Sequence, residues 1–255
     1  MPTVKLILEY DGTAYAGWQR QPGQPTIQEA LETAIKQLTQ LDVSVLGAGR
    51  TDAGVHALGQ VVSFRIEKNW SPDEWTKGMN ARLAKDIAVR MAAIMPDDFH
   101  ARHAARGKLY QYRILNRPVR PAIERRYVWH VPKLLEHEVM RQAASSLVGF
   151  HDFTSFEGTL TDNEDPFCNL QQLSLRREGD HVIVEAYADR FLKHMVRAIV
   201  GTLVEVGHGK RPANEMVVIL DAKNRTRAGR TAPAHGLFLM RVDYEDPIVI
   251  LTDNS

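Results

Sequence analysis

The chain has almost no cysteine and no long apolar run. Cys168 is the only cysteine among 255 residues, which excludes an intramolecular disulfide framework and a thiolate-rich metal site and fits a reducing cytosol. No stretch approaches the roughly 18 apolar residues of a membrane span, and the apolar part of the N-terminus is too short for a signal peptide. We therefore expect a cytoplasmic protein with no membrane partner.

The chain also lacks an excess of charge of either sign. Lys and Arg number 32, Asp and Glu number 31, so no global electrostatic field points to a nucleic-acid partner, and such a site would have to be a local patch. A hydrophobic content of 44% and a charged content of 25% are ordinary for a globular protein. The length allows one large domain or two of roughly 120 residues.

Alternation and turn signals predict strands at 4–10, 43–48, 60–66, 86–95, 108–115, 126–131 and 237–244, and a hairpin over 169–188 that turns at Gly179-Asp180. Helical spacing predicts helices at 27–38, 71–83, 134–148, 194–206 and 214–222. Two capping boxes begin the first two helices: Thr26 with Glu29, and Ser71 with Glu74.

Strands outnumber helices of crossover length, and several are joined by short turns. This pattern predicts an α+β fold with mainly antiparallel sheets flanked by helices. The polar, basic segment at 98–108 reads as a linker or cleft rim, so we expect the boundary between Pro96 and Gly107. The two α+β halves would then be residues 1–105 and 106–255.

The loop GAGRTDAGVHALGQ, residues 47–60, places four glycines around Arg50, Asp52 and His56. Its glycine spacing matches neither a dinucleotide-binding nor a phosphate-binding loop. One interpretation is a connection that glycine merely permits. The other is a functional loop, because catalytic residues favour loops on rigid scaffolds.

Asp52 and His56 could be the acid and base of a hydrolase, or two ligands of a metal. The other histidines show no metal-binding spacing, there is no G-x-S-x-G motif, and Cys168 lies in no recognisable catalytic context. We therefore expect no metal and favour a carboxylate that works alone, with an arginine as its partner.

Four basic groups, two of them mixed with aromatic residues, suggest what such a carboxylate acts on. They are Tyr10, Tyr15, Trp18 and Arg20; Tyr110 and Tyr112 with Arg102, Arg106, Lys108 and Arg113; Arg190, Lys193, His194 and Arg197; and Lys223, Arg225, Arg227 and Arg230. Core packing of the aromatics and a solvated basic surface are the plain interpretations. Together the groups are typical of stacking on an unpaired base with contacts to phosphates. We expect Lys193 and Arg197 to share one helix face.

Seven motifs follow one another over nearly the whole chain: YDGTAYAGWQ, GRTDAGVHALGQV, FHAR, KLYQYRI, GFHDFTSF, FLKHMVRAIVG and APAHGLFLMRVDY. In these motifs and in their order, the chain resembles the TruA-type tRNA pseudouridine synthases. The resemblance implies isomerisation of uridine to pseudouridine at positions 38, 39 and 40 in the anticodon stem-loop of tRNA, without cofactor or metal. It also implies two similar α+β halves around a central cleft, and a homodimer.

Carried over residue by residue, the resemblance makes Asp52 the catalytic aspartate and Tyr110 the tyrosine that stacks on the target base. Arg197 is implied to pair with the aspartate, and Arg50 to help extrude the nucleotide. His56 becomes a structural or RNA-contact residue rather than a catalytic partner. The further RNA contacts that we expect are Arg20, Lys108, Lys193 and His194.

The segment 159–170 departs from the family pattern, because Asp162, Glu164 and Asp165 stand where basic residues are common, and Cys168 where an arginine is common. Two rival functions stay open: an RNA-binding protein without catalysis, and a nucleoside hydrolase, which would need a second carboxylate. The sequence also leaves open whether Asp52 attacks C1′, removes the C2′ proton or adds to the ring.

Overall fold

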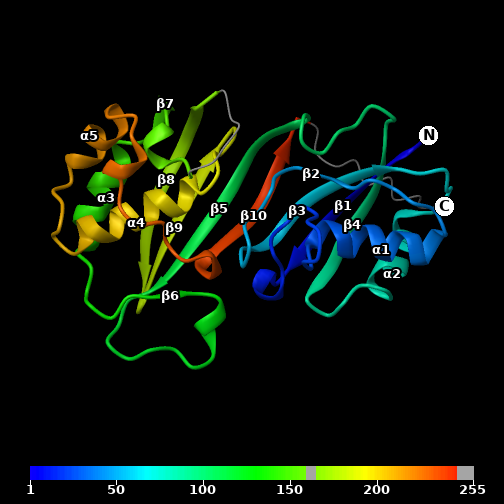
Figure 1. Ribbon diagram of the computed structural model, residues 1–255, viewed down its shortest axis with the longest axis horizontal. Helices are drawn as coiled ribbons and strands as arrows, with labels where there is room; N and C mark the ends of the chain where they lie inside the picture. The colour runs from blue at the N-terminus through cyan, green and yellow to red at the C-terminus, as the bar shows by residue number, and fades with distance from the viewer. Residues whose placement is uncertain (159–164, 246–255) are drawn as a thin grey trace. The chain divides into compact units, whose positions relative to one another are not determined.

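The chain forms two compact units in a computed structural model that describes residues 1–158 and 165–245 (Figure 1). Unit 1 consists of Met1–Arg106 and Leu239–Ser255, and unit 2 consists of Gly107–Phe238. The break at 106/107 lies in the segment where a boundary is expected. The last strand, however, counts with unit 1 and not with the second half.

Unit 1 is built on strands in the order β4-β1-β3-β10, in which β1 is antiparallel to both β3 and β4. Its strands are β1 (Thr3–Tyr10), β3 (His56–Arg65), β4 (Ile87–Met95) and β10 (Leu237–Tyr244), and the short β2 (Leu46–Gly47) pairs with β3. Val4, Leu6 and Leu8 of β1 are fully buried. The expected strand at 43–48 is wrong in length, because the backbone N–H and carbonyl of Val45 bond the side chains of Glu32 and Gln28 instead of a strand.

Helices α1 (Ile27–Thr39) and α2 (Pro72–Asn80) lie together in unit 1 (Figure 1). The capping box of α2 is complete, since Ser71 and Glu74 satisfy each other's backbone N–H groups. In α1 only one half forms as expected: Thr26 Oγ1 accepts from the N–H of Glu29 at 3.4 Å. The Glu29 carboxylate lies 3.6 Å from Arg20.

Unit 2 contains the strand order β5-β9-β8-β7. Its strands are β5 (Ala105–Leu115), β7 (Gly149–Asp152), β8 (Phe167–Glu178) and β9 (His181–Ala188), all antiparallel to their neighbours, and β6 (Trp129–His130) runs parallel beside β5. The hairpin turns at Gly179, whose φ of 59° lies in the left-handed region that glycine tolerates. The predicted α+β class with mainly antiparallel sheets is confirmed.

Three helices accompany the unit 2 sheet: α3 (His137–Ser145), α4 (Met195–Gly207) and α5 (Glu215–Asp221) (Figure 1). Nearly every residue of α4 is buried, as an apolar helix inside a folded unit requires. Short 3₁₀ turns complete the chain: η1 (Gly12–Ala14), η2 (Glu124–Arg126), η3 (Thr154–Phe156), η4 (Arg225–Arg227) and η5 (Ala234–Gly236).

The acidic segment at 159–170 is only partly described. Asp162 and Glu164 lie outside the described residues. Asp165 forms an ion pair with Arg190 at 2.7 Å, so this acid lies against a member of the third basic group.

Candidate active site

Asp52 lies on the loop that joins β2 to β3 in unit 1. The N–H of Val55 donates to the carbonyl of Asp52 at 3.1 Å, which closes a tight turn. Gly54 takes φ of 78° inside that turn, a conformation that a residue with a side chain rarely adopts. The Asp52 side chain is half-buried, and Arg50 beside it is exposed.

Thr51, the residue before Asp52, is held by the N-terminal segment. The N–H of Trp18 donates to the Thr51 carbonyl at 3.0 Å, and the hydroxyls of Tyr10 and Thr51 share a hydrogen bond of 2.8 Å. Tyr10 is 4% exposed, and burial raises the pKa of its phenol to about 12. A neutral phenol at this position fixes the loop without adding charge.

Two glycines let the N-terminal segment approach the Asp52 loop this closely. A Cβ on Gly12 would overlap the carbonyl oxygen of Val55, and one on Gly17, where φ is 96°, would lie 2.7 Å from the carbonyl of Thr51. Contact closer than about 3.0 Å is not tolerated between such atoms. The segments YDGTAYAGW and GRTDAGV are therefore one structural element, joined through their backbones.

Gln60, on β3, fixes the start of the loop at Gly49. Its side-chain amide donates to the carbonyl of Gly49 at 2.8 Å, and its own carbonyl accepts the N–H of Val61 at 3.2 Å. Gln60 is fully buried, so both bonds form away from water, where an unmade hydrogen bond is expensive. Thr51 and Gln60 could not be identified from the sequence as supports of the Asp52 loop, because only their spatial contacts reveal that role.

His56 is a structural residue in unit 1. It is 1% exposed, and its Nδ1 accepts the N–H of Gly12 at 3.1 Å. The same nitrogen lies 3.1 Å from Asp11. His56 Nδ1 therefore lies between the backbone of Gly12 and the carboxylate of Asp11, both in the N-terminal segment.

Two of the three aromatic residues in the first basic group, Tyr10 and Trp18, pack in the core. Trp18 is 3% exposed, and Tyr10 is equally buried. The hydroxyl of Tyr15 donates to Asp86 at 2.7 Å. Arg20 lies between two acids, 3.6 Å from Glu29 and 3.4 Å from Glu32. The core interpretation therefore holds for Tyr10 and Trp18.

Tyr110 and Tyr112 lie on one face of β5 in unit 2, as alternation requires. Tyr110 is 7% exposed and makes an edge-to-face contact with Phe191, with ring centroids 5.1 Å apart. Tyr112 is fully buried, and its hydroxyl donates to the carbonyl of Pro233 at 2.7 Å. Burial raises the pKa of Tyr112 well above its usual value, although the positive charge of Arg197 acts to lower that pKa.

Arg197 lies near the start of α4. Its Nε donates to the carbonyl of Ala232 at 2.8 Å, and the N–H of Ala232 donates back to the Arg197 carbonyl at 3.0 Å. The expectation that Lys193 and Arg197 share a helix face is wrong. The helix begins only at Met195, after His194 takes a left-handed φ of 62°, so Lys193 precedes it and is exposed.

Several expected phosphate contacts have partners inside unit 2. Lys223 pairs with Asp152 at 3.1 Å, and the guanidinium of Arg230 lies 4.7 Å from the centre of the Trp129 ring. Arg225 donates to the backbone and to Thr231 of the segment that follows it. Three members of the fourth basic run therefore support the fold.

The second basic group is also partly engaged. Arg106 pairs with Glu245, and the Arg113 guanidinium stacks 3.9 Å from the centre of the Phe238 ring. Burial lowers the pKa of Arg113. Lys108 is half-buried beside Tyr110 in sequence, and Arg102 is exposed.

Arg50 and Asp52 thus lie on one loop of unit 1, and His56 is the first residue of β3, which follows that loop. In unit 2, the structure gathers Tyr112 and Arg197 at the segment Ala232-Pro233. Tyr110 lies on the same strand face as Tyr112. Lys193 and His194 lie in the turn that leads into α4.

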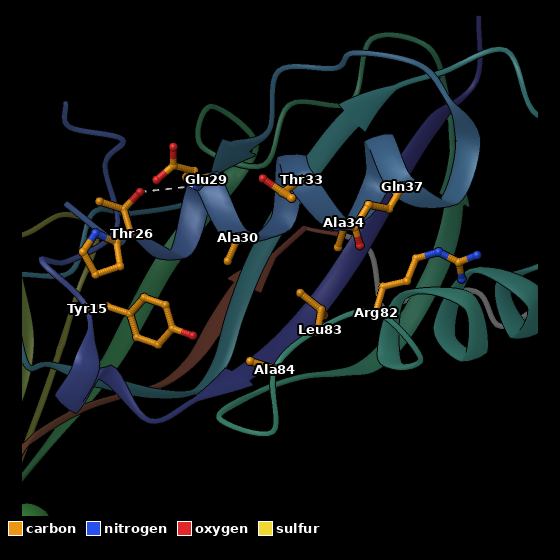
Figure 2. Close-up of a pocket in the computed structure, with 11 residues that line it drawn as sticks. Tyr15, Thr26, Glu29, Ala30, Thr33, Ala34, Gln37, Arg82, Leu83 and Ala84 are labelled. Atoms are coloured by element: carbon orange, nitrogen blue, oxygen red, sulfur yellow. Dashed lines mark hydrogen bonds between the residues drawn. The ribbon is translucent and has the colours of Figure 1, made fainter. Parts of the chain in front are cut away.

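A surface hollow of about 270 Å³ lies in unit 1, beside α1 (Figure 2). Tyr15, Thr26, Glu29 and Arg82 are among the residues that line it. The members of the Asp52 loop are not among its lining residues, so the hollow is distinct from the candidate site.

Over the residues that the structure describes, no cluster of three or more His, Cys, Asp or Glu side chains could hold a metal ion. Nor does any helix within the described ranges have the length and apolar character needed to cross a membrane.

Comparison with known proteins identifies many relatives. A family model described as tRNA pseudouridine synthase matches residues 6–103 and 143–245. The chain is 45% identical over 247 residues to a protein named tRNA pseudouridine synthase A from Methylobacterium nodulans, covering 96% of this chain and 97% of that protein. Proteins with the same name from Legionella pneumophila and from an Enterobacter species are 42% and 45% identical, covering 98% and 95% of this chain and 96% and 90% of their own lengths.

Proposed function

The chain belongs to the tRNA pseudouridine synthase family, and from that premise we propose that it converts uridine to pseudouridine at positions 38, 39 and 40, in the anticodon stem-loop of tRNA. The reaction is an isomerisation. The bond from ribose C1′ to uracil N1 breaks, the base turns over, and C1′ bonds to C5. The proton that C5 loses is balanced by one that N1 gains, so no cofactor takes part.

The observation that carries the proposal is the Asp52 loop. Hydrogen bonds at Gly49 and Thr51 fix the backbone before the aspartate, and the turn closed by the Val55 N–H fixes the backbone after it. A carboxylate held this way can assist the reaction by attacking C1′, by removing the C2′ proton or by adding to the ring. Fixing the reacting group in advance reduces the entropy that the transition state must lose.

Arg197 is the proposed partner of Asp52, since an opposite charge within about 4 to 6 Å favours the ionised carboxylate. Tyr110 is proposed to stack on the uracil ring, with its hydroxyl as a base for the C5 proton. Extruding a base from a stem costs a few kcal/mol, and we assign Arg50, exposed beside the loop, to help that step.

Contacts with the RNA backbone are assigned to Lys108, Lys193 and His194. We assign Arg20 and His56 a role in supporting the fold around the site, because Arg20 lies between two acids and His56 is buried. We also propose that the protein acts on tRNA as a homodimer, as the family resemblance implies, and that it is cytoplasmic, as its composition leads us to expect.

The test is release of tritium from tRNA labelled at uracil C5. Wild-type protein is expected to release tritium from the anticodon stem-loop, and tRNA with cytidine at positions 38, 39 and 40 serves as the control substrate. Asp52→Asn keeps the shape of the side chain but removes its charge, so it should lose activity while tRNA binds within about tenfold of wild type.

Each alternative has its own signature in this assay. Substantial activity in Asp52→Asn would contradict the aspartate mechanism. Tight tRNA binding by wild-type protein without tritium release would identify an RNA-binding protein without catalysis. Appearance of a free base in solution would identify a nucleoside hydrolase.

A further inference from the structure

A short stretch of unit 2, which we call the 229–233 segment (Gly229 to Pro233), lies along α4. Within it, the Ala232 carbonyl accepts Arg197 Nε at 2.8 Å, and the Pro233 carbonyl accepts the Tyr112 hydroxyl at 2.7 Å. The guanidinium group is planar, so a bond at Nε restricts the plane in which the rest of the group lies. The position of this segment therefore sets the orientation of Arg197.

The 229–233 segment is itself fastened from two sides. From α4, Thr202 Oγ1 accepts the N–H of Gly229 at 2.9 Å, and the Glu205 carboxylate accepts the N–H of Arg230 at 3.3 Å. A Cβ on Gly201 would overlap the Arg230 carbonyl oxygen. Only a glycine on α4 allows the segment to lie this close.

The second fastening is Arg225, on the 3₁₀ turn η4. Its two terminal nitrogens donate to the Gly229 carbonyl at 3.0 Å and to Thr231 Oγ1 at 2.8 Å. The fork of the guanidinium spans the segment from its first residue to its third. A lysine has one nitrogen and cannot reproduce both bonds in this geometry.

We propose that Arg225 is a positioning residue for pseudouridine formation, which acts on the chemical step through the 229–233 segment and Arg197. The inference rests on the proposed function, in which Arg197 holds the catalytic aspartate. Its sequence neighbours suggested a phosphate contact for Arg225, whereas its observed partners are the backbone and a side chain of its own unit. Misplacing a catalytic group by about 1 Å can lower a rate about 100-fold.

The test compares Arg225→Ala with Arg125→Ala, because Arg125 also lies on a 3₁₀ turn of unit 2, is exposed and donates to a backbone carbonyl. The single-turnover rate of pseudouridine formation is measured with saturating enzyme, and tRNA affinity is measured separately. We expect Arg225→Ala to slow the chemical step at least tenfold with tRNA affinity within threefold of wild type. Arg125→Ala should leave the chemical step within twofold.

Two further variants separate positioning from loss of stability. A saturated single-turnover rate does not depend on the fraction of folded enzyme, so a variant that is only less stable keeps the wild-type rate constant. Arg225→Lys should restore less than half of the lost rate. Thr231→Val removes one of the two acceptors and should slow the chemical step by a smaller factor, with the protein folded.

A double-mutant cycle asks whether Arg225 acts through Arg197. In an Arg197→Lys background, Arg225→Ala should have at most a threefold effect, because the guanidinium that it orients is gone. Independent, multiplicative effects would overturn the proposal. So would a rate constant for Arg225→Ala within twofold of wild type, or a loss confined to tRNA affinity. If wild-type protein itself forms no pseudouridine, the proposed function fails and not this inference alone.

Discussion

The hydroxyl of Tyr10 illustrates how single residues support Asp52. It lies 2.8 Å from Thr51 Oγ1, next to the aspartate and away from water. The sequence shows that Tyr10 belongs to a group that includes a basic residue, but it does not show whether the Tyr10 ring stacks on a base or packs in the core. Alternation gives the period of a strand, and both interpretations satisfy that period.

Tyr10→Phe should therefore affect both stability and catalysis. It leaves the buried Thr51 hydroxyl without its phenol partner, which should lower the free energy of unfolding by about 1 to 3 kcal/mol. It should also slow single-turnover pseudouridine formation by roughly three- to tenfold, since the backbone beside Asp52 is less fixed. Urea denaturation and the saturated rate measure the two effects.

Tyr244→Phe is a suitable control for that variant. The Tyr244 hydroxyl donates to the Ala101 carbonyl at 2.8 Å, so the control also removes one phenol hydrogen bond from unit 1. It should reduce stability while leaving the rate constant unchanged. Equal effects of the two substitutions on the rate would show that Tyr10 has no special link to the Asp52 loop.

Arg225 and Lys193 show the limit of sequence prediction for charged residues. Both belong to basic runs that resemble a surface for phosphates. Arg225 binds its own chain at two points, while Lys193 is exposed before α4. A run of basic residues gives no information on which side chains fold back, because that depends on acceptors far along the chain.

At the scale of elements, the sequence predicts helix starts well because capping depends on neighbouring residues. Ser71 and Glu74 form the full capping box of α2. Thr26 caps α1 as expected, while Glu29 turns toward Arg20, a contact outside the local pattern. The start of α4 is less predictable, since His194 adopts a left-handed conformation that is uncommon among residues other than glycine, although histidine takes it more often than most.

Substitution of Gly201 in α4 distinguishes helix propensity from packing, because the two predict opposite changes in the free energy of unfolding. Replacing a helix glycine by alanine normally stabilises the helix by about 1 kcal/mol. Here the new Cβ would overlap the Arg230 carbonyl, so Gly201→Ala should destabilise the protein and displace the 229–233 segment. Urea denaturation should show a lower unfolding free energy, and the chemical step should slow.

Gly78 in α2 is the matched control. A Cβ there meets the end of the Leu38 side chain at 2.9 Å, and such a side chain can move. Gly78→Ala should therefore be nearly neutral or stabilising. A stabilised Gly201→Ala variant would contradict the packing that we infer between α4 and the 229–233 segment.

At the scale of the whole molecule, the balanced net charge is reflected in ion pairs within each unit. Many arginines pair with acids of their own unit, as Arg20 does with Glu29 and Glu32, and Arg176 with Glu178 and Glu185. The composition predicted that a site for RNA would be local, and such pairing reduces the number of cations that a phosphate can meet. The return of β10 to unit 1 could not be predicted, because alternation identifies a strand without identifying its neighbours.

Two half-buried histidines, His208 and His235, should make the free energy of unfolding depend on pH above the range where carboxylates titrate. Burial lowers the pKa of His208 and of His235, and in both cases nearby cations act in the same direction. In the unfolded chain these side chains take up protons near pH 6.5. Between that pH and their lower folded pKa values, the unfolded state binds more protons than the native state, so stability rises with pH.

The free energy of unfolding should accordingly fall as the pH is lowered from about 7.5 to about 5.5. Urea denaturation across this interval measures the slope, and His235→Asn should flatten it because the substituted side chain does not titrate. Proton NMR of the imidazole rings would follow each histidine directly. An unfolding free energy that stays constant or increases as the pH falls would contradict the lowered pKa values, because linkage fixes the sign of the slope.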